Sequence, residues 1–408
     1  MLYDLHEIQR SFLTPLAAFT DTSAQLFSHP YSPLSYMPAS RHIAAAYELM
    51  YRLGKDYEKP AWNLNQTKID GTPVAVSCET IHTGPFCRLL HFRRDTPPGH
   101  ADDPKILLVA PLSGHHATLL RDTVRALLPA HDVHVTDWID ARMVPVAAGS
   151  FGLDDYVRTI RDFIRLLAPD VHVISVCQPT VPVLAAIALM AAAGETRLPR
   201  SMIMMGGPID ARRSPTQVDR LATTKSYDWF ETNLIHRVPA RYPGAGRPVY
   251  PGFLQHAGFM AMNPDRHLRS HYEFYLHLLQ NDDEDAQAHR RFYDEYNAVL
   301  DMTAEFYLDT IRTVFQEYRL PSGTWVIDGQ KVEPAAISNV ALFTIEGELD
   351  DISGQGQTRA AHDLCTGIAQ ARRQHYTAPG CGHFGIFSGR RWRTTIYPKI
   401  AAFIRNAA

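Results

Sequence analysis

The chain has 408 residues, of which 45% are hydrophobic and 20% are charged, and its formal net charge is −3 at pH 7. This balance gives no reason to expect nucleic-acid binding, and the length allows a large core. No stretch reaches about 18 apolar residues, so we expect no transmembrane segment. The first residues lack a signal-peptide pattern, and five cysteines without framework spacing indicate a reducing, cytoplasmic environment.

The N-terminal part of the chain, residues 1–65, is predicted to form a mainly helical extension. From 66 to 209, and again from 338 to 408, short apolar runs with many β-branched residues alternate with helical patterns. The pattern over 156–167 places its apolar residues on one helical face, as in a helix that covers a sheet. This alternation predicts an α/β core with a mostly parallel sheet covered by helices on both faces.

An early strand and its following loop supply candidate hydrogen-bond donors. The run Lys105–Ala110 is apolar after its first residue and is typical of a strand buried on both faces. In the loop that follows, the backbone N–H of Leu112 or Ser113 is a candidate for stabilising an oxyanion. His115 and His116 also suggest a metal site, but no carboxylate or third histidine has matching local spacing. We therefore expect no metal here.

The most informative stretch is a strand that leads directly into a cysteine and a helix. Val171–Val176 is followed by Cys177 and then by an Ala- and Leu-rich helix. This order is typical of a nucleophile elbow, and Ser175 and Pro179 fit the crowded positions that flank it. The N-terminus of the helix favours a thiolate. We interpret Cys177 as a nucleophile and the N–H of Gln178 as a second oxyanion donor; the alternative is a cysteine that only fills the core.

The other cysteines have no such context. We interpret all four as packing residues: Cys78, Cys87, Cys365 and Cys381.

A long insertion separates the strand at 201–205 from the next convincing strand, which begins near Ser338. Residues 210–337 are far more numerous than an ordinary crossover requires. They are rich in aromatic residues and contain helical patterns such as 271–280 and 303–317. We predict an inserted, largely helical cap domain above the elbow. Most of its aromatic residues are expected to be core, and a minority are expected to line an apolar channel or surface.

Two later strands place an acid and a histidine in loops. The apolar run Val340–Ile345 precedes Asp350 and Asp351, and a weaker strand precedes a Pro- and Gly-rich loop that carries His383. Nucleophile, acid and histidine thus follow in the chain order of an α/β-hydrolase. The histidine would take the thiol proton, and the carboxylate would hold the imidazole in place. The spacing from Gly347 favours Asp350 over Asp351 as the acid.

Three motifs carry a family resemblance. They are Ser-Val-Cys-Gln-Pro at 175–179, Gly-Glu-Leu-Asp-Asp-Ile-Ser-Gly-x-Gly-Gln-Thr at 347–358 and Gly-Cys-Gly-His-Phe-Gly-Ile-Phe at 380–387. With the Met-Leu-Tyr start and the Pro-Leu-Ser-Gly-His loop, they resemble the intracellular poly(3-hydroxybutyrate) depolymerases, which are related to the polyhydroxyalkanoate synthases. The resemblance covers essentially the whole chain and implies an α/β-hydrolase fold.

The resemblance also implies a cytoplasmic enzyme that degrades amorphous storage granules. By motif, Cys177 is the nucleophile, Asp350 the acid and His383 the base. A hydroxyacyl-thioester intermediate would then release 3-hydroxybutyrate or short oligomers to water, with coenzyme A as an alternative acceptor. No metal or bound cofactor is required. The granule surface is the expected partner, and the hydrophobic cap leaves a homodimer open.

Other functions remain open on the sequence alone. A synthase-like acyltransferase would use the same triad, but the Gly-x-Cys-x-Gly elbow expected of synthases is missing. A small-lactone hydrolase fits the chemistry, although the aromatic cap suits a bulkier substrate. A catalytically silent granule-coat protein would keep the fold, and the intact triad argues against it.

Overall fold

A nine-stranded sheet forms the centre of the protein. The structure, a computed structural model, describes residues 2–97, 99–100, 102–262 and 264–407. The strand order is β1-β2-β3-β5-β4-β6-β7-β13-β14. The strands are β1 (Gln66–Ile69), β2 (Thr72–Thr83), β3 (Cys87–Arg94), β4 (Lys105–Val109), β5 (Asp132–Trp138), β6 (Val171–Val176), β7 (Ser201–Met205), β13 (Ala341–Gly347) and β14 (Arg373–Ala378).

The strands from β5 to β14 run parallel, whereas β1, β2 and β3 form an antiparallel edge that joins at β5. The predicted strands at 171–176 and 201–205 have the observed bounds of β6 and β7. The carboxyl ends of the parallel strands meet at one edge of the sheet. Loops from β4, β6, β13 and β14 can therefore supply a common site.

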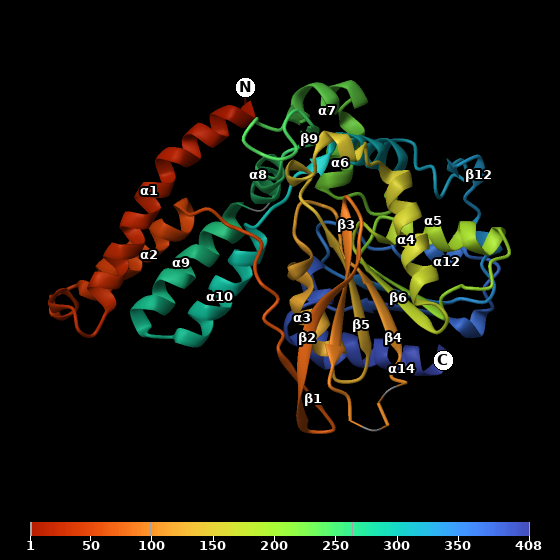
Figure 1. The fold of residues 1–408 in the computed structure, drawn as a ribbon, viewed down its shortest axis with the longest axis horizontal. Helices are drawn as coiled ribbons and strands as arrows, with labels where there is room; N and C mark the ends of the chain where they lie inside the picture. The colour runs from red at the N-terminus through yellow and green to blue at the C-terminus, as the bar shows by residue number, and fades with distance from the viewer. Residues whose placement is uncertain (1, 98, 101, 263, 408) are drawn as a thin grey trace.

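Helices cover both faces of the sheet, which confirms the predicted α/β fold class (Figure 1). Val173 of β6 belongs to the hydrophobic cluster on one face, and its neighbours Ile174 and Val176 belong to the cluster on the other. This alternation follows from the two-residue period of a strand. The first face is covered by α4 (Leu153–Leu167), α5 (Thr180–Ala192) and α12 (Ala361–Leu364); the second by α3 (Arg121–Leu127) and α14 (Tyr397–Ala407).

The long insertion between β7 and β13 contains both helices and short strands. Its helices are α6 (Gln217–Thr224), α7 (Tyr227–Leu234), α8 (Gly252–Met262), α9 (Pro264–Gln280), α10 (Asp283–Tyr296) and α11 (Ala304–Thr310), the last continued by a π-helical turn at Ile311–Gln316. We did not expect its strands, which are β8 (His236–Arg237), β9 (Pro248–Tyr250), β10 (Met302–Thr303), β11 (Val326–Ile327) and β12 (Gln330–Lys331). Each has only two or three residues, too few to produce a recognisable alternation.

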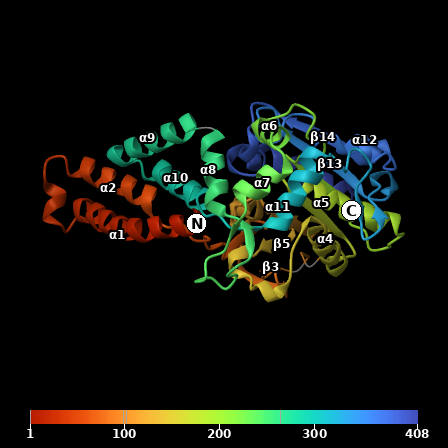
Figure 2. The same cartoon turned by 90° about the horizontal axis from the view of Figure 1, so that it is seen from above.

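Four helices form an arm that projects from this body. Figures 1 and 2 both show α1 (Leu2–Ser28) and α2 (Ser40–Gly54) beside α9 and α10 of the insertion. Arg52 of α2 contacts Asp294 of α10 at 2.9 Å, and Arg290 of α10 contacts Glu48 of α2 at 2.7 Å. The N-terminal extension and the insertion therefore form one continuous structure.

All five cysteines are free thiols. One prediction about them is wrong, because Cys78 is exposed rather than packed; β2 lies toward the edge of the sheet, and most of its side chains face solvent. In the part of the chain that the structure describes, no helix is both long and apolar enough to cross a bilayer.

Candidate active site

Cys177 occupies a strained turn between β6 and α5. Its φ is 68°, in the left-handed region that non-glycine residues rarely adopt. Two backbone hydrogen bonds hold the turn: the N–H of Cys177 donates to Met205 O at 2.7 Å, and the N–H of Thr180 donates to Cys177 O at 3.1 Å. The turn lifts the Cys177 side chain above the end of the sheet, where it is only partly buried.

A glycine pair after β7 lets the chain pass close to this turn. A Cβ on Gly207 would lie 1.8 Å from Thr180 Oγ1 and 2.5 Å from Cys177 O. Gly206 has a φ of 57°, and a Cβ there would lie 3.3 Å from His383 Cε1. Only glycine fits this approach without displacing the elbow or the imidazole.

Asp350 and His383 lie beside Cys177. His383 Nδ1 is 2.8 Å from Asp350 Oδ2, and the other carboxylate oxygen accepts the N–H groups of Ile352 and Ser353 at 2.9 and 2.8 Å. Cys177 and His383 line the same cavity, and Cys177 is close enough to the imidazole to raise its pKa. The structure thus brings the three sequence-predicted residues together, with Asp350 rather than the exposed Asp351 in contact with His383.

Charge at the site favours a protonated imidazole. Burial alone lowers the pKa of His383, but the negative charges of Asp350 and Cys177, together with the hydrogen bond to Asp350, outweigh burial and raise the pKa well above 6.5. The native state therefore holds this proton more tightly than the unfolded chain does. The resulting stabilisation is fully present below the unfolded pKa of about 6.5 and is lost as the pH rises through the folded pKa.

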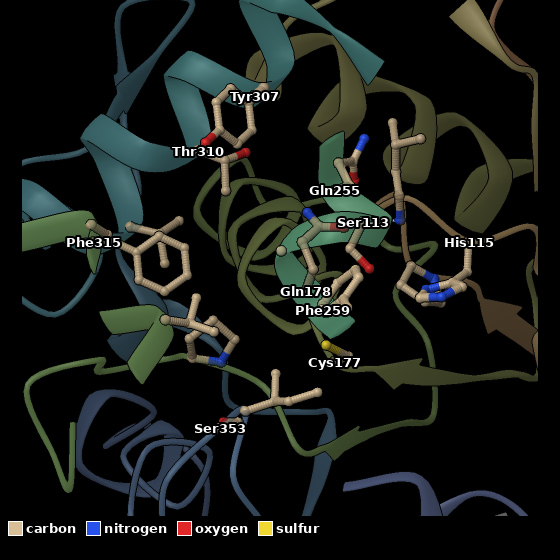
Figure 3. Close-up of a pocket in the computed structure, with 18 of the residues that line it drawn as sticks. Ser113, His115, Cys177, Gln178, Gln255, Phe259, Tyr307, Thr310, Phe315 and Ser353 are labelled. Carbon is tan, nitrogen blue, oxygen red and sulfur yellow. Dashed lines mark hydrogen bonds between the residues drawn. The ribbon is translucent and has the colours of Figure 1, made fainter. Parts of the chain in front are cut away.

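The sulfur faces a cavity of about 530 Å³ beneath the insertion. Figure 3 shows Cys177 with Gln178 and Phe259 on one side and Ser353 on the other. The lining is mostly apolar and comes largely from α6, α8, α11 and the π-helical turn, including Leu221, Ala222, Phe230, Tyr250, Phe259, Met262, Phe306, Tyr307, Ile311, Val314 and Phe315. Such a cavity is suited to an apolar ligand that reaches the sulfur.

The candidate oxyanion donors also line this cavity. The N–H of Leu112 donates to the side-chain Oε1 of Gln178 at 3.2 Å. Among the described residues, the N–H groups of Ser113 and Gln178 donate no hydrogen bond. Two backbone donors are therefore available, and a third is occupied by an amide that a ligand oxygen can replace.

Neither histidine of the β4 loop is arranged as a metal ligand. His115 is buried, its Nε2 lies 3.1 Å from Tyr296 O, and burial lowers its pKa to about 4. His116 is buried as well, and burial lowers its pKa to about 3. Burial therefore favours the neutral form of both histidines, and His115 packs against Phe259 and Tyr296 of the insertion.

A cluster of His91, Asp132 and His134 lies elsewhere, between β3 and β5. Its two imidazole rings are stacked at 4.3 Å with only 1° between their planes. A metal ion must lie near the plane of each imidazole that binds it, and two parallel stacked planes have no common point. His91 Nε2 instead pairs with Asp132 at 2.6 Å, so the cluster fits a metal poorly.

A second group of this kind, His277, Asp282 and Asp285, surrounds the start of α10. Asp282 caps that helix by accepting the N–H of Asp285 at 3.2 Å, and its other oxygen lies 3.1 Å from His277. These contacts account for the group without a ligand.

The strand order, the cysteine at the turn after β6 and the histidine and acid after β14 and β13 define the α/β-hydrolase class. Residues 206–408 match the family described as PHB de-polymerase C-terminus. The chain therefore belongs to the poly(3-hydroxybutyrate) depolymerase family, as this C-terminal half shows. A comparison with the curated proteins finds no match.

Solved structures resemble the chain only distantly. A hydrolase from Pseudomonas aeruginosa PA01 is 13% identical, with a TM-score of 0.46 over 81% of this chain and 98% of that chain. A monoacylglycerol lipase from Paleococcus ferrophilus is 12% identical, with a TM-score of 0.44 over 74% of this chain and 95% of that chain. At these values the similarities carry no argument about function, and the fold class rests on the topology of this chain.

The sequence did not identify the residues that shape the cavity. Of the aromatic residues in the insertion, Tyr307 and Phe315 reach the cavity, whereas Phe274 is core and Tyr272 is exposed. Nothing in their local sequence distinguishes these cases. In the sequence, the glycine pair at 206–207 marks only the end of a strand and does not indicate the close approach to Cys177.

Proposed function

We propose that this chain is a depolymerase that hydrolyses ester bonds of amorphous poly(3-hydroxybutyrate) storage granules in the cytoplasm. The observation that carries the proposal is the Asp350–His383 hydrogen bond beside Cys177, with His383 and Cys177 both at the wall of an apolar cavity. The chain's family membership supports the polyester as substrate.

In the first step, the Cys177 thiolate attacks an ester carbonyl of the polymer. The carbonyl oxygen becomes an oxyanion and accepts hydrogen bonds from the N–H groups of Gln178 and of Leu112 or Ser113. His383 then donates its proton to the departing alkoxide, which leaves as a hydroxyl end. This step breaks the ester C–O bond and leaves a hydroxyacyl thioester on the sulfur.

In the second step, His383 removes a proton from water, and the hydroxide formed attacks the thioester. The carboxylic acid leaves, and the site returns to its starting state, with a Cys177 thiolate beside a protonated His383. Asp350 keeps Nδ1 of the ring protonated and directs Nε2 toward the reacting atoms. Coenzyme A is an alternative acceptor, for which the product would be a thioester instead of the free acid.

The surroundings of the sulfur suit a flexible polyester. The cavity wall is dominated by aliphatic and aromatic side chains, so a substrate is held mainly by apolar contact. We infer that residues 210–337 act as the cap that forms this wall, that residues 66–209 and 338–408 are the catalytic core, and that residues 1–65 are an extension packed on the cap. No metal or bound cofactor is required by this chemistry.

The direct test is release of 3-hydroxybutyrate and soluble oligomers from amorphous granules by the purified protein. Replacement of Cys177 by Ala should abolish release, a loss of at least about 10³-fold. The matched control is Cys78→Ala, which removes an exposed thiol outside the cavity and should leave the rate unchanged. Release that survives Cys177→Ala would contradict the thiol mechanism.

The same assay can distinguish the acceptor. If coenzyme A accelerates consumption of polymer and hydroxyacyl-coenzyme A accumulates, thiolysis replaces hydrolysis. If the unmutated protein releases nothing from granules but turns over coenzyme A thioesters, the synthase-like reaction replaces the depolymerase.

A further inference from the structure

Helix α1 differs from an ordinary surface helix in the side chains that it buries and exposes. Its side chains toward the protein are small or polar, including Ala17, Thr20, Ser23 and Ala24. Most of its large apolar side chains face outward, and Phe12 and Phe19 are 74% and 61% exposed, whereas Tyr3 is buried. We call the outward set the α1 stripe: Leu5, Ile8, Phe12, Leu16, Phe19 and Leu26. An exposed row of this kind indicates an interaction surface.

The helix is fixed to its own chain mainly by its other faces, and of the stripe Phe19 also contacts Tyr47 of α2, with 6.2 Å between the ring centroids. Tyr3 donates to Asp301 at 2.7 Å, Arg10 contacts Asp56 at 2.7 Å, and Glu7 pairs with Arg241. In Figures 1 and 2, α1 lies along the outer edge of the arm, with no other segment outside it. The stripe therefore belongs to a helix that is already packed on its own chain. No other part of the chain that the structure describes is positioned to cover it.

The spacing of the stripe matches a helix as its partner. Leu5, Phe12, Phe19 and Leu26 are each seven residues apart, the repeat by which two α-helices keep one seam in contact. None of the four charged residues of α1, at positions 4, 7, 10 and 21, lies on the stripe. Three of those four are acidic, which makes an anionic lipid surface a poor partner.

The stripe is also complementary to itself. The four positions are symmetric about the peptide between Pro15 and Leu16. If two copies of α1 run antiparallel about a two-fold axis at that point, position 12 faces position 19 of the second copy and position 5 faces position 26. Isologous contacts of this kind close a dimer without further growth.

We propose that this protein forms a homodimer through antiparallel pairing of the α1 stripes. Half-exposed side chains of this size each present on the order of 100 Å², so the six residues of the stripe offer about 600 Å² per copy, against the roughly 800 Å² that each partner buries in a standard interface. The pairing joins the two arms and leaves each catalytic body at an outer end. It does not depend on the reaction proposed above.

The first test measures molecular mass by light scattering over a micromolar concentration range. The unmutated protein should have twice the chain mass of 45.9 kDa, and Phe12→Asp with Leu16→Asp should be monomeric. Leu268→Asp is the matched control, since that side chain is 73% exposed on α9 outside the stripe, and it should stay dimeric. A monomeric unmutated protein, or a dimeric Phe12→Asp, Leu16→Asp variant, would overturn the proposal.

The second test measures the register. In a Cys78→Ser background, a mixture of Phe12→Cys and Phe19→Cys chains should form disulfide-linked heterodimers. Phe12→Cys alone should not, because positions 12 of the two copies would lie about 10 Å apart along the axis, too far for a disulfide. Efficient cross-linking of Phe12→Cys alone would contradict the antiparallel register.

A third readout separates a second copy from the granule surface. If the unmutated protein is monomeric, and Phe12→Asp with Leu16→Asp abolishes granule sedimentation but not hydrolysis of a soluble short ester, the stripe binds polymer and the dimer proposal is wrong. Loss of soluble ester hydrolysis by Cys177→Ala remains a separate test of the reaction.

Discussion

Helices α5 and α1 are both rich in apolar side chains, yet the protein uses them in opposite ways. Every residue of α5 from Thr180 to Met190 is buried, beneath the sheet and against α4. In α1 most of the large apolar residues are exposed, whereas Ala17, Thr20, Ser23 and Ala24 are covered. Hydrophobic character alone therefore does not predict burial; it predicts that a surface will be covered, whether by the same chain or by a partner.

The two helices also differ in how their packing affects the site at Cys177. α5 starts at the elbow, so its packing fixes the position of Cys177. α1 is anchored to the insertion through the hydrogen bond from Tyr3 to Asp301, and none of its residues lines the cavity at Cys177. Changes near α5 should therefore impair catalysis and folding, whereas changes on the α1 stripe should affect assembly alone.

The largest expected effect comes from replacing Asp350, the acid that hydrogen bonds to His383. Asp350→Asn should lower kcat by about 10³- to 10⁴-fold, because the amide no longer offers His383 a negative charge and no longer fixes its tautomer. The pKa of His383 should fall as well, which proton NMR titration of the imidazole can measure. Asp351→Asn is the control; an equal loss in both variants would show that the contact between Asp350 and His383 has no special role.

The next effect concerns the core beneath the elbow. Leu184→Ala should reduce the free energy of unfolding by roughly 2–5 kcal/mol, since the side chain is fully buried in α5 and its removal leaves a cavity. Urea denaturation measures this loss. A change below about 1 kcal/mol would mean that α5 is less tightly packed than its burial indicates.

A smaller effect is expected where β7 passes the elbow. Gly207→Ala should cost roughly 1–3 kcal/mol and reduce activity, because the new methyl group would collide with the buried Thr180 side chain and with Cys177 O. Gly54→Ala at the end of α2 is the control, since a Cβ there meets only Ala17 Cβ, at an ordinary contact distance of 3.9 Å, and the residue lies outside the cavity. Thermal unfolding and ester hydrolysis would both be measured; equal behaviour of the two variants would contradict the close approach.

The smallest effect belongs to α1. Phe12→Ala should change the unfolding free energy of dilute, monomeric protein by less than about 0.5 kcal/mol, because its ring is largely exposed. The same substitution should weaken self-association, which analytical ultracentrifugation measures. A loss of stability as large as that of Leu184→Ala would contradict the conclusion that Phe12 contributes little to the folded monomer.

Much of the core was predictable because local signals agree with the global arrangement. The strand at 171–176 could be predicted because a strand that is covered on both faces needs a continuous apolar run. Asp350 and His383 were placed after strands by their Gly- and Pro-rich loops, and chain order then suggested the trio. The exposed Cys78 was missed because burial depends on a strand's place in the sheet, which its own residues do not encode.

The α/β alternation, the turn at Cys177, the order of the candidate catalytic residues and the preference for Asp350 over Asp351 could be predicted from the sequence, because each depends on neighbours in the chain. The sequence could not show that Asp350 contacts His383, that Tyr307 and Phe315 reach the cavity, or that Phe12 faces outward. These outcomes depend on contacts between segments far apart in the chain. The sequence around an aromatic residue does not show whether its side chain is buried, lines a cavity or is exposed at an interaction surface.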